Sequence, residues 1–288
     1  MLANLIGVLF DGVAYGSLLF LIAIGLSVTM GLMNFVNLAH GAFAMLGGYA
    51  AAVAMQRLGL PFLAALPLAF AAAALAGIVL ERTLFKRLYR ASPLDQVLFS
   101  IGITFMAVAA ATFVWGPNQQ PVRLPPFLRG QVHWLGLDLG VYRLFLIAAV
   151  LLLTLALTLL VERTRFGAKI RAAVDNQQAA AGLGINVNRV FALTFALGSG
   201  LAGLGGALGI DVLGLDPTFP IKYMVYFLLV VAVGGAGTIA GPLVAALILG
   251  VFDVAGKYYV PGIGAFVIYA LMVALLIAFP GGLRGRRA

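Results

Sequence analysis

The sequence predicts an all-α integral membrane protein, a polytopic helical bundle of about eight transmembrane helices, some of them short or interrupted by glycine and proline. Hydrophobic residues make up 63% of the 288 residues and charged residues only 9%, whereas soluble domains carry about 25% charged residues. The charged residues separate long apolar runs, and a helix needs about 20 residues to cross the hydrocarbon core. We therefore expect one transmembrane domain over residues 1–288, and we exclude a soluble enzyme, a disordered regulator and a nucleic-acid-binding module.

The spans are read from the stretches that contain no Asp, Glu, Lys or Arg. These stretches are 12–56, 58–80, 96–122, 144–161, 190–210, 223–252 and 258–283. Five of them fit one span each. The first, with 45 residues, is long enough for two and has a polar break at Asn34, Asn37 and His40. The stretch 223–252 is interrupted by helix breakers between Gly234 and Pro242, which favours two short segments.

The basic residues orient the chain. The net charge of +9 comes mostly from loops between apolar runs, which predicts contact with anionic membrane lipid rather than with nucleic acid. If 223–252 folds back as two segments, then 81–95, 162–189 and 283–288 lie on one side and hold twelve of the eighteen Lys and Arg residues. If it crosses once, each side holds nine. Because cytoplasmic loops carry the excess of Lys and Arg, we predict about eight spans rather than seven, with the N-terminus outside and the C-terminus cytoplasmic.

Residues 116–142 form the one sizeable loop that this topology places outside. The loop contains Pro117, Pro121, Pro125 and Pro126, which make it too irregular to cross lipid. We expect it to cap the outer face of the bundle. No Lys or Arg precedes the first apolar run, so we predict no cleavable signal peptide.

Glycine is abundant, with 36 residues, and is densest between Gly198 and Gly209. Within this run small residues recur four positions apart, as at Ala202 and Gly206. Small residues at this spacing let two helices approach closely, which drives helix packing in lipid. We interpret the run as a packing face, because a dinucleotide-binding fingerprint needs a strand–turn–helix context that a membrane span does not supply.

The composition also limits the chemistry. There is no cysteine and there are two histidines, and we predict no metal site and no catalytic residue. Ser199 and His40 are the one conceivable nucleophile and base, but the residues around Ser199 lack the spacing of an intramembrane serine protease. The only Gly-Lys pair, Gly256-Lys257, precedes Tyr258, so the chain has no P-loop for ATP. We expect no cofactor on this chain.

The loop 162–189 is expected on the cytoplasmic side. Its alanine-rich middle favours a short helix, on which Ile170, Val174 and Ala181 would share one face. An amphipathic helix at this place either docks into a groove on a soluble partner or rests on lipid. The residues alone leave both interpretations open.

Two stretches are candidate parts of a translocation pathway or its gate. The polar side chains of Asn34, Asn37 and His40 are three apart and would share one helix face near an inner turn, where they either line a gate or cap helix ends. The second stretch is the glycine-rich break, which exposes backbone groups that only protein or a cavity can satisfy. The full set is Asn34, Asn37, His40, Gly41, Gly234, Gly235, Gly237 and Thr238.

Three blocks of sequence occur in a defined order. The first runs from Gly25 to Gly41 and continues with Met45-Leu46-Gly47-Gly48-Tyr49. The second reads Arg-Ala-Ala-x-Asp-Asn from Arg171, followed by Leu183-Gly184-Ile185-Asn186, and the third runs from Val233 to Pro242. Together they resemble the permeases of branched-chain amino-acid ABC importers, over nearly the whole chain.

This resemblance implies the permease subunit of an importer in a bacterial-type inner membrane, for branched-chain amino acids or a related small polar solute. The expected partners are a second homologous permease subunit, two cytoplasmic ATPase subunits that bind the ATP, and an extracytoplasmic solute-binding protein. The loop 162–189 would be the coupling loop, through which the ATPases switch the bundle between outward and inward states. The residues expected to dock on an ATPase are Arg171, Asp175, Asn176, Ala180 and Gly184.

The alternative is an ATP-independent small-solute channel or an ion-coupled secondary transporter. An ion-coupled carrier usually needs an ionisable group along its path through the membrane. Asp11, Asp211 and Asp253 instead fall in the outer third of their predicted spans, where snorkelling or ion pairing explains them. This placement favours the importer.

Overall fold

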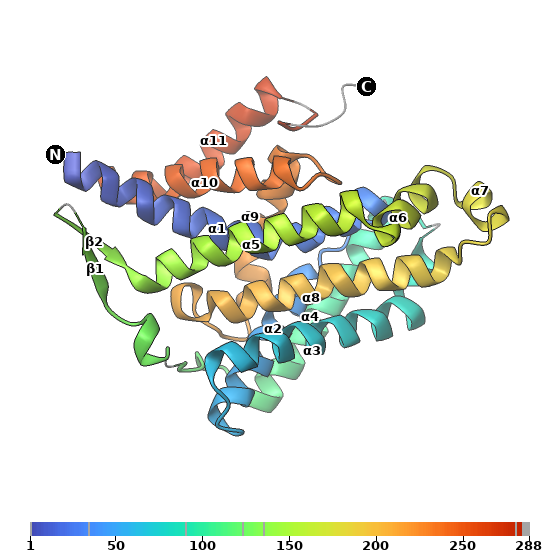
Figure 1. The fold of residues 1–288 in the computed structure, drawn as a ribbon, viewed down its shortest axis with the longest axis horizontal. Helices are drawn as coiled ribbons and strands as arrows, with labels where there is room; N and C mark the ends of the chain where they lie inside the picture. Colours follow the sequence, from blue (N-terminus) through green and yellow to red (C-terminus); the bar gives the residue numbers. More distant parts are fainter. Residues whose placement is uncertain are drawn as a thin grey trace.

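The computed structural model describes residues 2–33, 35–89, 91–122, 124–134, 136–279 and 281–283, which form an elongated bundle of helices (Figure 1). The α-helices are α1 (Leu2–Met33), α2 (His40–Gln56), α3 (Phe62–Thr83), α4 (Pro93–Trp115), α5 (Val141–Arg163), α6 (Arg165–Asp175), α7 (Gln177–Gly182), α8 (Val187–Leu213), α9 (Phe219–Gly234), α10 (Ala240–Tyr259) and α11 (Gly264–Ala278). The other described elements are the 3₁₀ helices η1 (Phe85–Leu88) and η2 (Pro126–Leu128) and the strands β1 (Gln131–Trp134) and β2 (Leu137–Gly140).

The predicted membrane fold is confirmed, with one more helix than expected. In the described residues, six helices are long and apolar enough to cross a membrane, namely α1, α3, α4, α5, α8 and α10. The apolar helices α9 and α11 are shorter, with 16 and 15 residues, and α2 has 17 residues and no Asp, Glu, Lys or Arg. Both divided stretches supply two helices and the other five supply one, which makes nine rather than about eight.

The bundle has two distinct ends (Figure 1). The N-terminus and the β1–β2 pair lie at one end, called here the hairpin end. The helices α6 and α7 project at the other, called here the α7 end. Helix starts at the α7 end follow from local sequence: Ser92 accepts a hydrogen bond from the backbone N–H of Asp95 at 3.2 Å before α4, and Asn186 accepts one from Arg189 at 3.0 Å before α8. These side chains satisfy donors that no helix carbonyl reaches.

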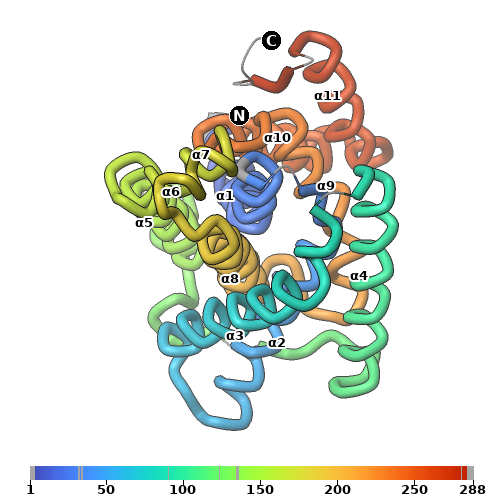
Figure 2. Tube along the Cα trace, turned by 90° about the vertical axis from the view of Figure 1, so that its right-hand side faces the viewer, coloured from blue at the N-terminus to red at the C-terminus, as the bar shows by residue number. Residues whose placement is uncertain are grey.

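The helix α1 lies at the centre of the bundle, with α10 and α8 packed most extensively against it (Figure 2). Glycine makes the close contacts possible. A side chain at Gly25 of α1 would overlap the carbonyl of Gly198 in α8, and a side chain at Gly206 would overlap the carbonyl of Ala44 in α2. The predicted packing role of the run 198–209 is therefore confirmed.

The predicted outer loop, residues 116–142, lies at the hairpin end and contains the antiparallel β1–β2 pair, which the sequence did not predict. Two hydrogen bonds fasten it to the helices. The backbone N–H of Gln120 donates to the carbonyl of Leu215 at 2.8 Å, and the Gln56 side chain donates to the carbonyl of Pro121 at 2.7 Å. The loop therefore crosses the hairpin end between α2 and the end of α8.

Candidate functional site

The helices α6 and α7 contain the residues predicted to dock on a partner, and they project from the α7 end (Figure 1). The sequence predicted one helix here, but the structure has two, because Asn176 interrupts the first and caps the second. The side-chain oxygen of Asn176 accepts a hydrogen bond from the backbone N–H of Ala179 at 2.9 Å. Asparagine favours such caps over helix interiors. Thr164 caps α6 in the same way, accepting from Gly167 at 3.2 Å.

Four of the five predicted docking residues are exposed and one is buried. The exposed residues are Arg171, Asp175, Asn176 and Gly184. Ala180 is only 2% exposed, so it fixes the position of α7 and does not present its side chain to a partner. The Arg171 guanidinium donates to the carbonyl of Val161, which also fastens α6 to the end of α5. Gly184 has a φ of +79°, a left-handed conformation that glycine adopts without strain.

The predicted apolar face of this segment is only partly present. Ile170 is 1% exposed and packs inward, as expected. Val174 is 37% exposed, and Ala181 is exposed on α7. Ile170 and Val174 stand four apart on α6 and therefore share one face of that helix, as predicted. Ala181 lies on α7, beyond the break at Asn176, so the face does not continue to it along a single helix.

Sequence reasoning missed Leu183, which follows α7 at the tip of the projection and is 80% exposed. A large apolar side chain on a projecting turn indicates a contact surface rather than a core position. The signal was present in the sequence, since Leu183 follows a helix-ending glycine in a segment of small and polar residues. We call these exposed residues the α6–α7 surface. It consists of the side chains of Arg171, Asp175, Asn176 and Leu183 and the backbone at Gly184.

Between α1 and α2 the chain turns back into the bundle through residues 35–39, an irregular segment that ends in a turn at 38–39. The backbone N–H of Val36 donates to the Gln96 side chain at 3.0 Å, and that of Leu38 donates to the Ser100 hydroxyl at 3.0 Å. Gln96 and Ser100 are both buried and stand four apart on α4. One face of α4 therefore supplies the partners that an isolated buried segment lacks.

The prediction that Asn37 and His40 share one helix face is wrong. Asn37 belongs to the irregular segment 35–39, where its side chain accepts a hydrogen bond from the backbone N–H of Ala39 at 3.0 Å, whereas His40 is the first residue of α2. Both are 1% exposed. Asn34, the third residue of that predicted face, lies outside the described residues.

His40 and Gly41 lie where α2 and α9 meet α1. The Nε2 atom of His40 is 2.8 Å from the carbonyl oxygen of Ile22 in α1, and its ring meets Phe227 of α9 edge-on with 5.8 Å between centroids. A side chain at Gly41 would come within 2.9 Å of the backbone of Pro220 in α9. Both residues therefore contact neighbouring helices.

The glycine-rich break between α9 and α10 also packs on α1. The backbone N–H of Gly237 donates to the carbonyl of Ser27 at 3.1 Å, and the Ser27 hydroxyl donates to the carbonyl of Thr238 at 3.1 Å. A side chain at Gly31 would overlap the backbone of Gly237. Gly234 and Gly235 end α9, with Gly235 at a φ of +87°.

The structure thus brings the two predicted gate stretches to the same part of α1. The first contacts α1 at Ile22, and the second contacts it at Ser27 and Gly31. Interrupted helices keep backbone groups that pair with other elements, and such segments exchange partners more readily than continuous helices. The helix α1 also contacts α6, so α1 contacts both interruptions and the first helix of the projection.

Replacing Gln96 with leucine and Ser100 with alanine tests whether these two side chains stabilise the segment 35–39. The double variant leaves the part-buried N–H of Val36 and the buried N–H of Leu38 unpaired. A buried unpaired group costs about 1–3 kcal/mol, so thermal unfolding in detergent should shift down by several degrees. Ser17→Ala is the control, since the Ser17 hydroxyl donates only to the carbonyl of Val13 in its own helix at 2.7 Å. An unchanged unfolding temperature in the double variant would contradict the assigned hydrogen bonds.

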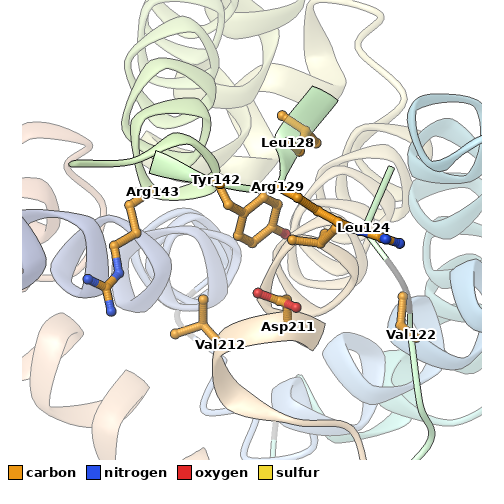
Figure 3. Close-up of a pocket in the computed structure, with 10 residues that line it drawn as sticks. Val122, Leu124, Leu128, Arg129, Tyr142, Arg143, Asp211 and Val212 are labelled. Atoms are coloured by element: carbon orange, nitrogen blue, oxygen red, sulfur yellow. The ribbon is translucent and has the colours of Figure 1, made fainter. Parts of the chain in front are cut away.

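A cavity of about 760 Å³ opens at the hairpin end, between the start of α5, the end of α8 and the outer loop (Figure 3). Its charged lining consists of Asp211, Arg129 and Arg143. Figure 3 shows Asp211 beside the ring of Tyr142, whose hydroxyl donates to the carbonyl of Leu208 at 2.6 Å. A cavity of this size with charges of both signs is suited to a small polar solute.

The predicted ion pairing of the acidic residues is confirmed for two of them. Asp11 of α1 pairs with Arg143 of α5, and Asp253 of α10 pairs with Lys257 one turn later at 2.5 Å. Asp253 is 1% exposed, and its Oδ1 atom has no hydrogen-bond partner among the described residues. Both residues belong to α10, and removing Lys257 would leave the buried carboxylate without its ion-pair partner.

Comparison with known proteins finds relatives along nearly the whole chain. A family described as branched-chain amino acid transport system / permease component matches residues 8–276. The high-affinity branched-chain amino acid transport system permease protein BraD of Pseudomonas aeruginosa is 28% identical over 96% of this chain and 95% of its own length. The Escherichia coli K12 permease LivH, described in the same words, is 28% identical over 96% of this chain and 94% of its own. The probable branched-chain amino acid transport permease LivH of Methanocaldococcus jannaschii is 27% identical, with coverages of 96% and 92%. No solved structure matches the chain.

Proposed function

Since the chain belongs to the branched-chain amino acid transport system permease family, we propose that it is the membrane-spanning subunit of an ATP-binding-cassette importer. In this proposal ATP is hydrolysed on separate subunits, and this chain moves the solute across the inner membrane by alternating access. The α6–α7 surface is the observation that carries the proposal, because two short helices projecting beyond the spans, with Leu183 80% exposed at their tip, are suited to docking into a groove on another protein.

The contacts of α6 support a mechanical role. The helix α6 touches α5, α8 and α1, and the carbonyl of Val161 at the end of α5 accepts a hydrogen bond from Arg171. A push on the projection therefore reaches three spans at once. On α1 it reaches the helix that holds both interrupted segments, and repacking of those segments would open or close the α7 end.

The cavity at the hairpin end supports solute entry from the opposite side. It lies under the outer loop and carries Asp211 together with Arg129, whereas Arg143 is paired with Asp11. A zwitterionic solute presents an ammonium and a carboxylate, which charges of both signs accommodate. In this proposal the hairpin end, with the N-terminus, faces the outside, and the α7 end faces the cytoplasm.

The proposed assembly contains a second homologous permease subunit, two cytoplasmic ATPase subunits and an extracytoplasmic solute-binding protein. BraD and LivH are named for high-affinity branched-chain amino acid transport, and we propose branched-chain amino acids or a related small polar solute for this chain. The ATPase subunits bind at the α6–α7 surface. The solute-binding protein delivers solute at the hairpin end.

Affinity purification of the tagged chain from native membranes in mild detergent, followed by mass spectrometry, tests this assembly. We expect two P-loop ATPase subunits and a second multispan subunit to remain bound. The purified assembly in vesicles should then accumulate leucine only when ATP is supplied on the side of the α7 end. Recovery of the chain alone in several detergents, with solute flux that is independent of ATP, would instead support a channel or an ion-coupled carrier.

A further inference from the structure

A second charged cavity, of about 380 Å³, lies at the α7 end where α3 and η1 approach the start of α8. It is lined by Glu81, Arg82, Lys86, Asn186, Asn188 and Arg189. Three of these side chains are cationic and one is anionic, so the lining carries a net charge of about +2. The proposed transport mechanism uses none of them.

The single carboxylate of this cavity is buried and hydrogen-bonded within the protein. Glu81 is 1% exposed, and it accepts a hydrogen bond from the hydroxyl of Tyr89 at 2.7 Å. Burial raises the pKa of the Tyr89 phenol, and the hydrogen bond to Glu81 raises it further, so the phenol keeps its proton and remains a donor. The carboxylate therefore has a partner within the protein.

The three cationic side chains of this cavity have no ion-pair or hydrogen-bond partner among the described residues. Arg82, Lys86 and Arg189 are exposed, and none of their side chains forms an ion pair or donates a hydrogen bond within that part of the chain. The first turn of α8, a helix of 27 residues, adds unpaired backbone N–H groups and the positive end of the helix dipole. The cavity is thus an anion site without an anion from this protein.

The depth of the cavity identifies the source of the anion. Arg82 stands in the last turn of α3 and Arg189 in the first turn of α8, and both helices are membrane-span candidates. The cavity therefore lies where the spans leave the hydrocarbon, whereas α7 projects beyond this level (Figure 1). Phospholipid phosphates occupy that level, and basic pockets between spans on the cytoplasmic side bind anionic headgroups.

Exposed apolar side chains continue from the cations into the membrane. Leu75 and Val79, which are 63% and 59% exposed, precede Arg82 on the same face of α3. Leu193, which is 43% exposed, follows Arg189 by one turn on α8. A lipid with its phosphate at the cations would lay its acyl chains along these residues. We propose that this cavity binds one anionic phospholipid, with its phosphodiester held by Arg82, Lys86 and Arg189.

Native mass spectrometry of the full chain, titrated with phosphatidylglycerol or phosphatidylcholine in detergent, tests the proposal. We expect one phosphatidylglycerol to be retained in clear preference to phosphatidylcholine. Each cation near a membrane surface contributes about fivefold in affinity for anionic lipid, so Lys86→Gln should weaken retention about fivefold. The triple variant Arg82→Gln/Lys86→Gln/Arg189→Gln should lose the preference.

The matched control is Arg57→Gln/Lys169→Gln/Lys222→Gln, which removes the same charge from exposed residues outside this cavity. It should retain phosphatidylglycerol as the unmodified chain does. Equal retention of both lipids by the unmodified chain, or unchanged retention by Lys86→Gln and the triple variant, would overturn the proposal. Displacement of the lipid by millimolar inorganic phosphate, or by added ATPase subunits, would overturn it too, since the site would then serve a free anion or a protein.

Discussion

Replacing Leu183 with aspartate is expected to reduce ATP-dependent transport by tenfold or more, while the protein remains inserted and folded. Leu183 is 80% exposed in the isolated chain, so the substitution costs little folding free energy, within about 0.5 kcal/mol for a surface site. Burial of a leucine side chain at an interface contributes about 1.5–3 kcal/mol, and a buried unpaired carboxylate would oppose docking further. The measurement is solute uptake together with the amount of ATPase that co-purifies with the chain.

The matched control for this variant is Val132→Asp in β1, which also places a carboxylate on an exposed apolar residue, here 44% exposed, but at the hairpin end. It should keep the ATPase bound. Leu183→Ala should give an intermediate loss, because it removes the apolar contact without adding a charge. Normal uptake and ATPase retention in Leu183→Asp would refute the docking role of the α6–α7 surface. Loss of membrane insertion would refute the assumption that this turn makes no folding contact.

Residues 162–189 show which features the sequence was sufficient to predict. The pattern of charges placed residues 162–189 between two spans, and its alanines predicted helix, as the structure has it. The interruption at Asn176 was missed, because its side chain competes for the backbone N–H of Ala179, and such local competition changes the helix pattern at a single residue. Leu183 was missed because a leucine in an otherwise helical pattern is normally read as a buried residue.

The segment 35–39 shows why other features could not be predicted from the sequence. The spacing of Asn37 and His40 fits a helix face equally well, and hydropathy does not distinguish the two. The non-helical conformation is stabilised by Gln96 and Ser100, which lie about 60 positions later in the sequence. Their side chains accept hydrogen bonds from the backbone of this segment. Contacts over such distances in the sequence are not encoded in local periodicity. In contrast, the run 198–209 was interpreted correctly, since small residues four apart have few other uses in a membrane helix.

Gly206→Ala is expected to cause the largest loss of stability of any single methyl addition proposed for this chain. A Cβ at Gly206 would overlap the carbonyl oxygen of Ala44, and it would lie 2.6 Å from the carbonyl carbon of the same residue. Both are backbone atoms of α2, so no side-chain rotation relieves the overlap. The helices α2 and α8 must move apart, at a cost of about 1–3 kcal/mol or more for overpacking. Thermal unfolding in detergent should shift down by roughly 5 °C or more.

Gly102→Ala is the matched control: it makes the same glycine-to-alanine change but is not expected to lower the stability. Gly102 lies within α4, and a Cβ built there meets nothing within 4 Å. Alanine in a helix interior is favoured over glycine by about 0.5–1 kcal/mol, so this variant should be as stable as the unmodified chain or slightly more stable. If the two variants unfolded at the same temperature, α2 and α8 would not be in backbone contact. The position of His40 against α1, which depends on that contact, would then have to be revised.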